Sequence, residues 1–177
     1  MHTRVVLVLL SGLASVAGDC RPPAPGTQSG GDAVAADSAT IPDSAVTSYG
    51  DSLQVVLSAP TRVQVGEPVR ITLRVRNVGP KRLDLGLLGR EIAFDFLVAR
   101  KDGVVVWRRL EGEMIPAILQ LRTLAPGEAL ELADVWDQRT NQGERVGPGE
   151  YTIRGELPTD EPEPLRAGPV RLTITGG

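Results

Sequence analysis

Hydrophobic and polar residues alternate along most of the chain after residue 49. The clearest run is 69–76, where Val69, Ile71, Leu73 and Val75 alternate with Arg70, Thr72, Arg74 and Arg76. An alternating run has one face for the core and one for water, which is the pattern of a half-buried β-strand. Other alternating runs cover residues 53–57, 83–87, 92–98, 151–157 and 170–174, and shorter ones cover 104–107, 118–124 and 128–135.

Turn-forming residues separate these runs and set the fold class. The turns are Gly66-Glu67-Pro68, Gly79-Pro80, Lys101-Asp102-Gly103, Pro126-Gly127 and Gly147-Pro148-Gly149. About seven to nine short strands without a helical period predict an all-β protein, an immunoglobulin-like antiparallel β-sandwich. The chain has one cysteine, so the disulfide of antibody domains cannot form. Apolar packing must hold the sheets together, with Phe94, Phe96, Trp107 and Trp136 offering the most area.

The N-terminus has the pattern of an export signal. Residues 1–4 supply a positive charge at Arg4, and an apolar run follows from Val5 to Ala17. This run is too short to span a bilayer permanently. We therefore predict a signal peptide over residues 1–19 and export of the chain from the cytoplasm.

The only cysteine, Cys20, follows this signal directly. The sequence Ala17-Gly18-Asp19-Cys20 resembles a bacterial lipoprotein signal, which implies lipid attachment at Cys20 and a membrane anchor on the periplasmic or outer cell surface. Asp19 departs from the pattern, because the residue before the cysteine is usually Gly, Ala or Ser. The alternative is ordinary cleavage after Ser15-Val16-Ala17, which leaves Cys20 as a free thiol in a tail.

Residues 20–48 differ in composition from the rest of the chain. They are rich in Pro, Gly, Ala, Ser, Thr and Asp and have no sustained hydrophobic period. Such a segment cannot bury enough apolar surface to offset its ordering entropy. We predict a disordered tether that holds one folded domain, residues 49–177, roughly 30 Å from an anchored Cys20.

The mature chain lacks the residue types on which most hydrolases depend. His2 is the only histidine and lies in the segment that export would remove, so no imidazole remains for a catalytic triad or a zinc site. Asp134 and Asp137 are candidate acid/base carboxylates, but residues three apart in a strand point to opposite faces. Prolines interrupt the acidic run 160–163, which favours a solvated loop over a calcium site. We predict no catalytic residue, metal or cofactor, and no enzymatic activity.

The charge of the chain does not indicate a nucleic-acid partner. The net charge is −3, and the basic residues are scattered along the sequence. Proteins that bind nucleic acids normally gather positive charge on one face, where it displaces the counterions of the phosphates. We therefore expect protein partners and, through a lipid on Cys20, a membrane.

Aromatic and turn residues recur in a particular order between Asp51 and Thr175. They are Trp107, Pro126, Gly127, Trp136, Asp137, Pro148, Gly149 and Tyr151, together with Gly66-Glu67-Pro68-Val69, Arg76-Asn77-Val78-Gly79, Asp95-Phe96 and Asp102-Gly103. In this order and spacing the chain resembles the intracellular proteinase inhibitor (BsuPI) family. These positions look like scaffold: turn residues, two core tryptophans, and Tyr151 at a corner, where its hydroxyl would bond to nearby backbone.

The resemblance implies inhibition of subtilisin-type serine proteases by an exposed loop on a rigid scaffold. The family motif identifies no such loop. From the residues, 108–116 is the first candidate, since it offers Met114, Ile115 and Pro116, and Met114 would suit an apolar S1 pocket. The alternative is that Met114 and Ile115 fold back on the edge of the sandwich. A second candidate, 138–146, is polar and is alternatively a long hairpin connection.

Export would place the target outside the cytoplasm, as an extracytoplasmic serine protease or another protein of the cell envelope. The alternative function is a non-catalytic immunoglobulin-like interaction or assembly module, because a shared fold does not carry function by itself. An inhibitor needs a stable, cleavage-resistant loop. An assembly module would instead show an apolar patch or an unprotected edge strand.

Overall fold

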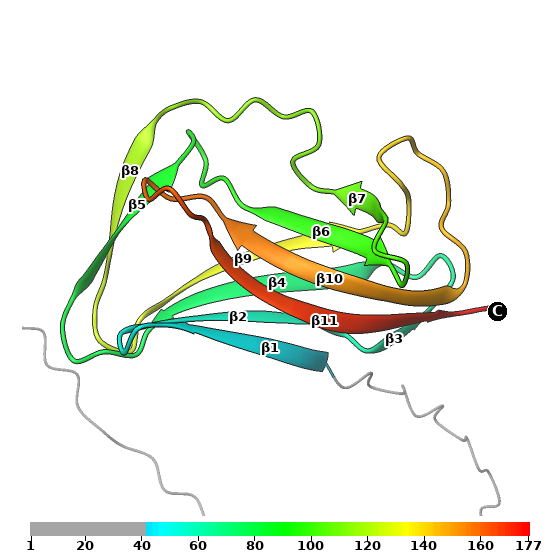
Figure 1. Ribbon diagram of the computed structural model, residues 1–177, viewed down its shortest axis with the longest axis horizontal. Helices are drawn as coiled ribbons and strands as arrows, with labels where there is room; N and C mark the ends of the chain where they lie inside the picture. Colours follow the sequence, from blue (N-terminus) through cyan, green and yellow to red (C-terminus); the bar gives the residue numbers. More distant parts are fainter. Residues whose placement is uncertain (1–41) are drawn as a thin grey trace, which may run out of the picture. The chain divides into compact units, whose positions relative to one another are not determined.

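Eleven β-strands follow one another in residues 42–177, the part of the chain that the computed structural model describes (Figure 1). No α-helix occurs in this part, which confirms the predicted all-β class. The strands are β1 (Pro42–Tyr49), β2 (Leu53–Pro60), β3 (Arg62–Gln64), β4 (Val69–Asn77), β5 (Leu83–Leu88), β6 (Asp95–Arg100), β7 (Val105–Arg108), β8 (Leu119–Leu124), β9 (Ala129–Trp136), β10 (Gly149–Leu157) and β11 (Leu165–Thr175).

The strands form two larger sheets that lie face to face, as the predicted sandwich requires (Figure 1). The first sheet has the order β1-β2-β4-β9 and is antiparallel throughout. The second has the order β3-β11-β10-β6-β7 and is antiparallel except for the pairing of β3 with β11. Strands β5 and β8 form a separate two-stranded ribbon at one end. Immunoglobulin-type connectivity stays a prediction.

The core lies between the two larger sheets and follows the alternation seen in the sequence. Strands β2 and β4 bury every second side chain, as the pattern predicts. Strands β6, β10 and β11 supply the opposite side of the core. The largest fully buried apolar side chains are Trp136, Phe96, Leu57, Ile71, Leu73, Leu87, Leu124, Ile153, Leu157, Leu172 and Ile174.

The folded domain begins earlier than predicted. Residues 42–48, assigned above to the tether, belong to β1, which pairs with β2 from Pro42↔Pro60 to Tyr49↔Leu53. This strand escaped prediction because it is an edge strand and only its partly buried side chains pack on the core, chiefly Ala45 and Tyr49. The Tyr49 hydroxyl also donates to the Arg166 carbonyl of the second sheet, 2.9 Å away. The three-residue β3 was likewise missed.

The two tryptophans differ in burial, which corrects the prediction that both lie in the core. Trp136 is fully buried, and its indole Nε1 donates to the Arg139 carbonyl at 2.7 Å. Trp107 is only half-buried, because β7 is the edge strand of its sheet. The Tyr151 ring meets that of Trp136 edge-on at 6.1 Å, and its hydroxyl donates to the Gly147 carbonyl at 2.7 Å. This last bond confirms the predicted corner.

The Pro126-Gly127 turn is built around a buried asparagine. Gly127 has a φ of 81°, which a turn with a left-handed second position requires. Its amide donates to the Asn77 carbonyl at 2.9 Å. The Asn77 side chain donates to the carbonyls of Lys81 and Leu124 at 2.7 and 2.9 Å. One fully buried side chain thus fixes the turn after β4 and the end of β8.

A second buried amide, Gln138, joins the turn before β4 to the segment after β9. It is 2% exposed and has a φ of 59°, which is rare for a residue other than glycine. Its Oε1 accepts from the Gly66 amide at 2.8 Å. Its Nε2 donates to the carbonyls of Gln64 and Glu67 at 2.7 and 2.6 Å. These three bonds explain why the unusual backbone angle is tolerated.

The predicted signal peptide, the lipid attachment at Cys20 and the rest of the tether lie outside the described residues. Within residues 42–177, no helix is long and apolar enough to cross a membrane.

Candidate functional site

The segment between β7 and β8 contains the candidate residues of the first predicted loop. It crosses the domain from the β7 end to the β5–β8 end (Figure 1). Every side chain from Glu111 to Leu119 is exposed. Met114 is 91% exposed, so it does not fold back on the sandwich, and Ile115 and Pro116 are exposed beside it. The alternative of a Met114 packed on the sandwich edge is therefore wrong.

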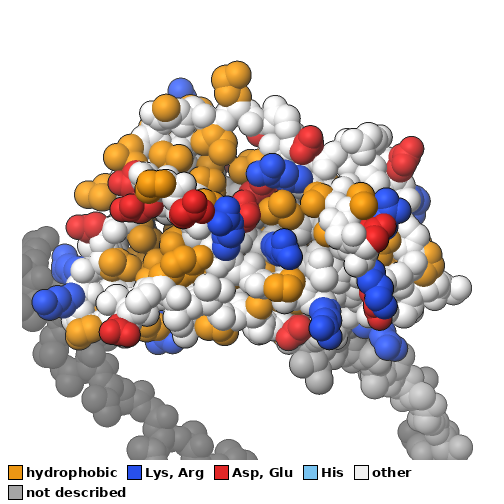
Figure 2. Space-filling model, in the orientation of Figure 1, with side chains coloured by type: hydrophobic (Ala, Val, Ile, Leu, Met, Phe, Trp, Pro, Cys, Tyr) orange, Lys and Arg blue, Asp and Glu red, His pale blue; other side chains and the backbone are white. Residues whose placement is uncertain are grey.

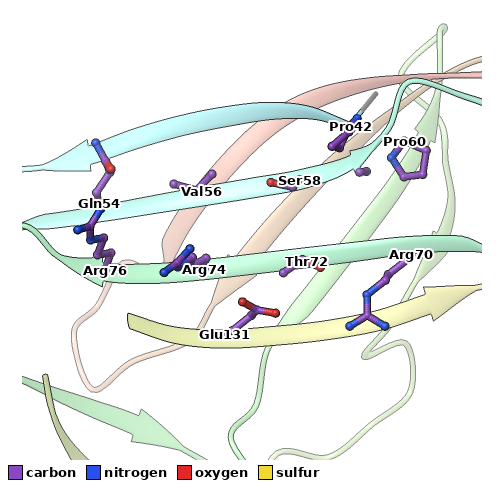
Figure 3. A pocket seen from close by; sticks show the side chains of 11 residues that line it. Pro42, Gln54, Val56, Ser58, Pro60, Arg70, Thr72, Arg74, Arg76 and Glu131 are labelled. Atoms are coloured by element: carbon purple, nitrogen blue, oxygen red, sulfur yellow. The ribbon is translucent and has the colours of Figure 1, made fainter. Parts of the chain in front are cut away.

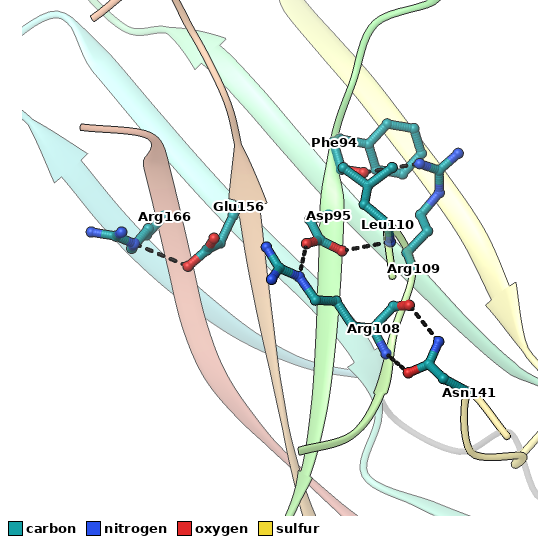
Figure 4. Close-up of polar contacts among 8 residues, drawn as sticks. All are labelled: Phe94, Asp95, Arg108, Arg109, Leu110, Asn141, Glu156 and Arg166. Atoms are coloured by element: carbon teal, nitrogen blue, oxygen red, sulfur yellow. Dashed lines mark hydrogen bonds and ion pairs between the residues drawn. The ribbon is translucent and has the colours of Figure 1, made fainter. Parts of the chain in front are cut away.

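The start of this segment is held by a buried carboxylate. Asp95 at the beginning of β6 is 1% exposed. One of its oxygens accepts from the Arg108 Nε, and the other accepts from the Leu110 amide at 3.1 Å (Figure 4). The hydrogen bond to Asp95 raises the pKa of Arg108 above its ordinary value. The ion pair lies on the outer face of the second sheet, where Glu156 is opposite Asp95 in register.

Arg109 makes a second attachment, which joins the start of the segment to β9 and to the residue before β6. Its Nε donates to Asp134 at 2.6 Å, and another guanidinium nitrogen donates to the Phe94 carbonyl at 2.9 Å. The guanidinium carbon lies 3.8 Å from the centre of the Phe94 ring, a cation–π contact (Figure 4). The Arg109 amide also donates to the Phe96 carbonyl at 3.0 Å. Backbone and side chain of this residue are therefore both fixed.

The second candidate loop, 138–146, braces the first. The Asn141 side chain accepts from the Arg108 amide and donates to the Arg108 carbonyl, both at 2.8 Å (Figure 4). Within the loop, the Thr140 amide donates to the Glu144 carbonyl at 2.8 Å, and the Gly143 amide donates to the Thr140 carbonyl at 2.9 Å. The segment is a hydrogen-bonded connection between β9 and β10, but it is not the predicted hairpin, because these two strands belong to different sheets.

The end of the exposed segment is attached to the turn after β5. The Gly89 amide donates to the Ile118 carbonyl at 2.9 Å. The Gln120 side chain donates to the Gly89 carbonyl at 2.6 Å and the Arg90 carbonyl at 3.0 Å. Both ends of the segment are thus held, while its middle makes few contacts with the core.

A hollow of about 600 Å³ lies between this segment and residues 89–94. Its wall includes Ile92, Phe94 and Leu132, and the Arg109–Asp134 ion pair lies at its edge. The stretch Glu113–Pro116 lines the opposite wall. The tip of the segment consequently stands away from the sandwich instead of resting on it.

The carboxylates considered for catalysis do not meet. Asp134 pairs with Arg109, whereas Asp137 is exposed and pairs with Arg139 at 3.4 Å. No group of three His, Cys, Asp or Glu side chains suited to a metal ion occurs in residues 42–177. Of the remaining motif residues, Pro126, Gly127, Pro148 and Gly149 stand in or beside the turns before β9 and β10.

Sequence reasoning missed the residues that hold the loop. Asp95 lies in a run of apolar residues, where its side chain would be buried. Because a buried carboxylate needs a basic or hydrogen-bonding partner, its position was the available signal. The consecutive arginines 108 and 109 were the complementary signal. Asn141 gives no signal of its own, because a polar residue in a predicted loop is unremarkable.

A family model described as "Intracellular proteinase inhibitor" (BsuPI) matches residues 57–162. The matched stretch starts in β2, ends after β10, and includes the exposed segment with all of its attachments. No curated protein matches the chain in sequence.

Similar solved structures include the C-terminal domain of wzt, with 13% identity and a TM-score of 0.42, covering 75% of this chain and 71% of that one. Another is a β-glucosidase from Listeria innocua in complex with glucose, with 13% identity and a TM-score of 0.38; the match covers 71% of this chain but only 16% of that one. A third is the alkylpurine DNA glycosylase AlkC of Pseudomonas fluorescens, with 11% identity, a TM-score of 0.39, and coverage of 71% and 31%. Similarities this distant carry no argument about function.

Proposed function

This chain belongs to the intracellular proteinase inhibitor (BsuPI) family, and we propose that it inhibits subtilisin-type serine proteases through the exposed segment between β7 and β8. The proposal is supported chiefly by Met114, an apolar side chain that is 91% exposed at the middle of a segment held at both ends. An unbranched apolar side chain presented in this way suits a large apolar S1 pocket.

The attachments of the segment give the physical reason for binding. A loop that is fixed before it meets its partner loses less conformational entropy on binding than a free one. Asp95 and Asn141 fix the start, and Gly89 and Gln120 fix the end. The residues between them are exposed, so a protease could pair its edge strand with their backbone.

We propose that this inhibition takes place outside the cytoplasm, with the domain anchored in a membrane by a lipid on Cys20. The support is the N-terminal sequence alone. Metabolic labelling with a fatty-acid analogue should mark the wild-type protein, and Cys20→Ala should move it to the soluble fraction. Wild-type protein that is soluble and begins at Gly18 would contradict this part of the proposal.

Titration of the purified protein against subtilisin-like and trypsin-like proteases tests the inhibition. We expect a stoichiometric end point with the subtilisin-like enzymes. Met114→Asp should weaken inhibition by about 3 kcal/mol, roughly a hundredfold, because it puts a charge into an apolar pocket. Val46→Asp on β1, where Val46 is 56% exposed, introduces the same charge elsewhere and should inhibit like the wild type.

Thermal unfolding completes the test, because both substitutions are at exposed positions and should leave the melting temperature nearly unchanged. Equal inhibition by wild type and Met114→Asp would exclude this segment as the protease contact. Failure of the wild type to inhibit any protease in the panel would contradict the proposed function as a whole.

One observation favours the second candidate function, an interaction or assembly module. Strand β8 is an edge strand in the β5–β8 ribbon, and Ile118, Leu119 and Leu121 are 41%, 57% and 72% exposed. Hydrophobic side chains gather over this end of the domain (Figure 2). Leu121→Asp distinguishes the two functions, since it should weaken an assembly contact and leave an inhibitor that acts through Met114 intact.

A further inference from the structure

The outward face of the first sheet has a row of arginines along β4. Arg70, Arg74 and Arg76 are exposed and alternate with buried residues of the same strand, so all three point away from the core (Figure 3). A hollow of about 510 Å³ lies on this face and is lined by all three. We call this hollow the arginine groove.

These arginines are free of ion pairs, unlike several others in the domain. Among residues 42–177, Arg108, Arg109, Arg122, Arg139 and Arg166 each pair with a carboxylate, whereas none of the three groove arginines does. Glu131 on β9 is opposite Arg74 in register and lines the same groove, yet makes no ion pair with it in this structure. With three arginines against one glutamate, the groove therefore has an excess of positive charge.

The floor of the groove is made of small and aliphatic side chains. Ser58 on β2 is opposite Thr72 on β4, and Val56 is opposite Arg74. Pro42 and Pro60, which pair with each other, line the end of the groove near Arg70 (Figure 3). The short side chains of Ser58 and Thr72 leave room for a ligand between Arg70 and Arg74. Their hydroxyls can form hydrogen bonds with the backbone of a bound peptide.

We propose that the arginine groove binds an extended acidic segment of a protein partner. At about 3.3 Å per residue, Arg70 and Arg74 are about 13 Å apart along the strand and Arg70 and Arg76 about 20 Å apart. Carboxylates with the same residue spacing on an extended chain would face these guanidiniums, which bind carboxylates through two hydrogen bonds. Aliphatic side chains of the segment would rest on Val56 and Pro60.

The shape and charge of the domain favour this partner over other anions. A flat bilayer surface cannot reach the floor of a hollow, whereas a single extended chain can. A long polyanion would be attracted weakly, because the whole chain has a net charge of −3 and Glu131 lies in the groove itself. A short segment with a few well-placed carboxylates fits both constraints. The proposal does not depend on protease inhibition, since Met114 does not line the groove.

Fluorescence anisotropy with the full-length protein tests the proposal. The probe is a labelled peptide of alanines and threonines with glutamates spaced as the groove arginines are, and the matched peptide has glutamines in their place. We expect binding of the glutamate peptide that falls with added salt, and no binding of the glutamine peptide. The triple change Arg70→Gln, Arg74→Gln and Arg76→Gln should weaken binding by about tenfold or more.

The control variant removes the same charge from the other sheet. Arg62, Arg154 and Arg171 on β3, β10 and β11 are exposed, make no ion pair among the described residues, and change to glutamine in this variant. It should bind like the wild type, with circular dichroism showing that both variants are folded. An equal loss in the two variants would overturn the proposal, as would equal binding of both peptides. Groove-dependent binding of anionic phospholipid vesicles without peptide binding would overturn it in favour of a membrane.

Discussion

Trp107 stacks on Trp136 with ring centroids 6.1 Å apart and an interplanar angle of 29°, although only Trp136 is fully buried. Tyr151 contacts the other side of this pair, so three aromatic residues of the family motif form one continuous row. The row runs from the edge strand β7 to the inner strand β10. Its members therefore contribute unequally to stability.

Replacing the two tryptophans should show this inequality. Trp136→Ala should lower the free energy of unfolding by about 3 to 5 kcal/mol, because it leaves a cavity between the sheets. Trp107→Ala should cost less, about 1 to 2 kcal/mol, since that ring is only partly buried and mainly the stacking is lost. Chemical denaturation of both variants measures the difference, and equal losses would contradict the structure.

The Asp95 carboxylate should control the order of the exposed segment. Asp95→Ala should lower the free energy of unfolding by about 2 to 3 kcal/mol, because the Leu110 amide and Arg108 both lose their partner. Limited proteolysis should then cut residues 111–118 faster than in the wild type. Asp51→Asn removes a carboxylate from an exposed turn and serves as the control. Unchanged cleavage in Asp95→Ala would show that the carboxylate does not order the segment.

The amide of Gln138 is predicted to be essential because no shorter or acidic side chain reproduces its bonds. Gln138→Ala should cost about 2 to 4 kcal/mol, as it leaves three backbone groups without their partner. Gln138→Glu keeps the size but cannot donate to the carbonyls of Gln64 and Glu67 at neutral pH, so it should cost at least as much. A glutamate variant as stable as the wild type would disprove the assigned donor role.

The Tyr151 hydroxyl should make stability depend on alkaline pH. Burial raises the pKa of this phenol above its ordinary value. The folded domain therefore holds the proton more tightly than the unfolded chain, and this contribution is present below about pH 10 and is lost as the pH rises through the folded pKa. Tyr151→Phe lacks it and also loses the bond to Gly147, worth about 1 kcal/mol.

Urea unfolding at neutral and alkaline pH measures this effect. The wild type should be more stable than Tyr151→Phe at neutral pH, and the difference should shrink above about pH 10. A difference that stays constant across this range would mean that Tyr151 does not ionise differently in the folded and unfolded states.

The sandwich could be predicted because its inner strands alternate clearly. Strands β2 and β4 have neighbours on both sides, so their side chains are sorted strictly into core and solvent positions. The edge strands lack this constraint. In β1, Val46 is 56% exposed and Ala45 and Tyr49 are only partly buried. The sequence of this strand therefore lacks the alternation of hydrophobic and polar residues that predicts a strand.

The exposed loop could be located from the sequence, but the bonds that hold its two ends could not. Met114 in a turn-rich stretch after Trp107 was a visible feature. The bonds of Asp95, Asn141 and Gln120 to this segment connect residues far apart in the chain, and such pairings follow from the register of strands that only the fold defines. Arg70, Arg74 and Arg76 were visible as the polar side of a strand. Their lack of ion pairs depends on which residues the neighbouring strands place beside them.

The position of β11 sets a limit on when this domain can fold. Among the strands of residues 42–177 it comes last, yet it lies inside the five-stranded sheet, between β10 and the parallel partner β3. During synthesis from the N-terminus, this sheet cannot be completed until residues 165–175 have left the ribosome. Pairings between such distant segments also form slowly. A chain whose synthesis has stopped short of residue 165 should consequently lack this inner strand, which leaves β3 and β10 without the partner that they share.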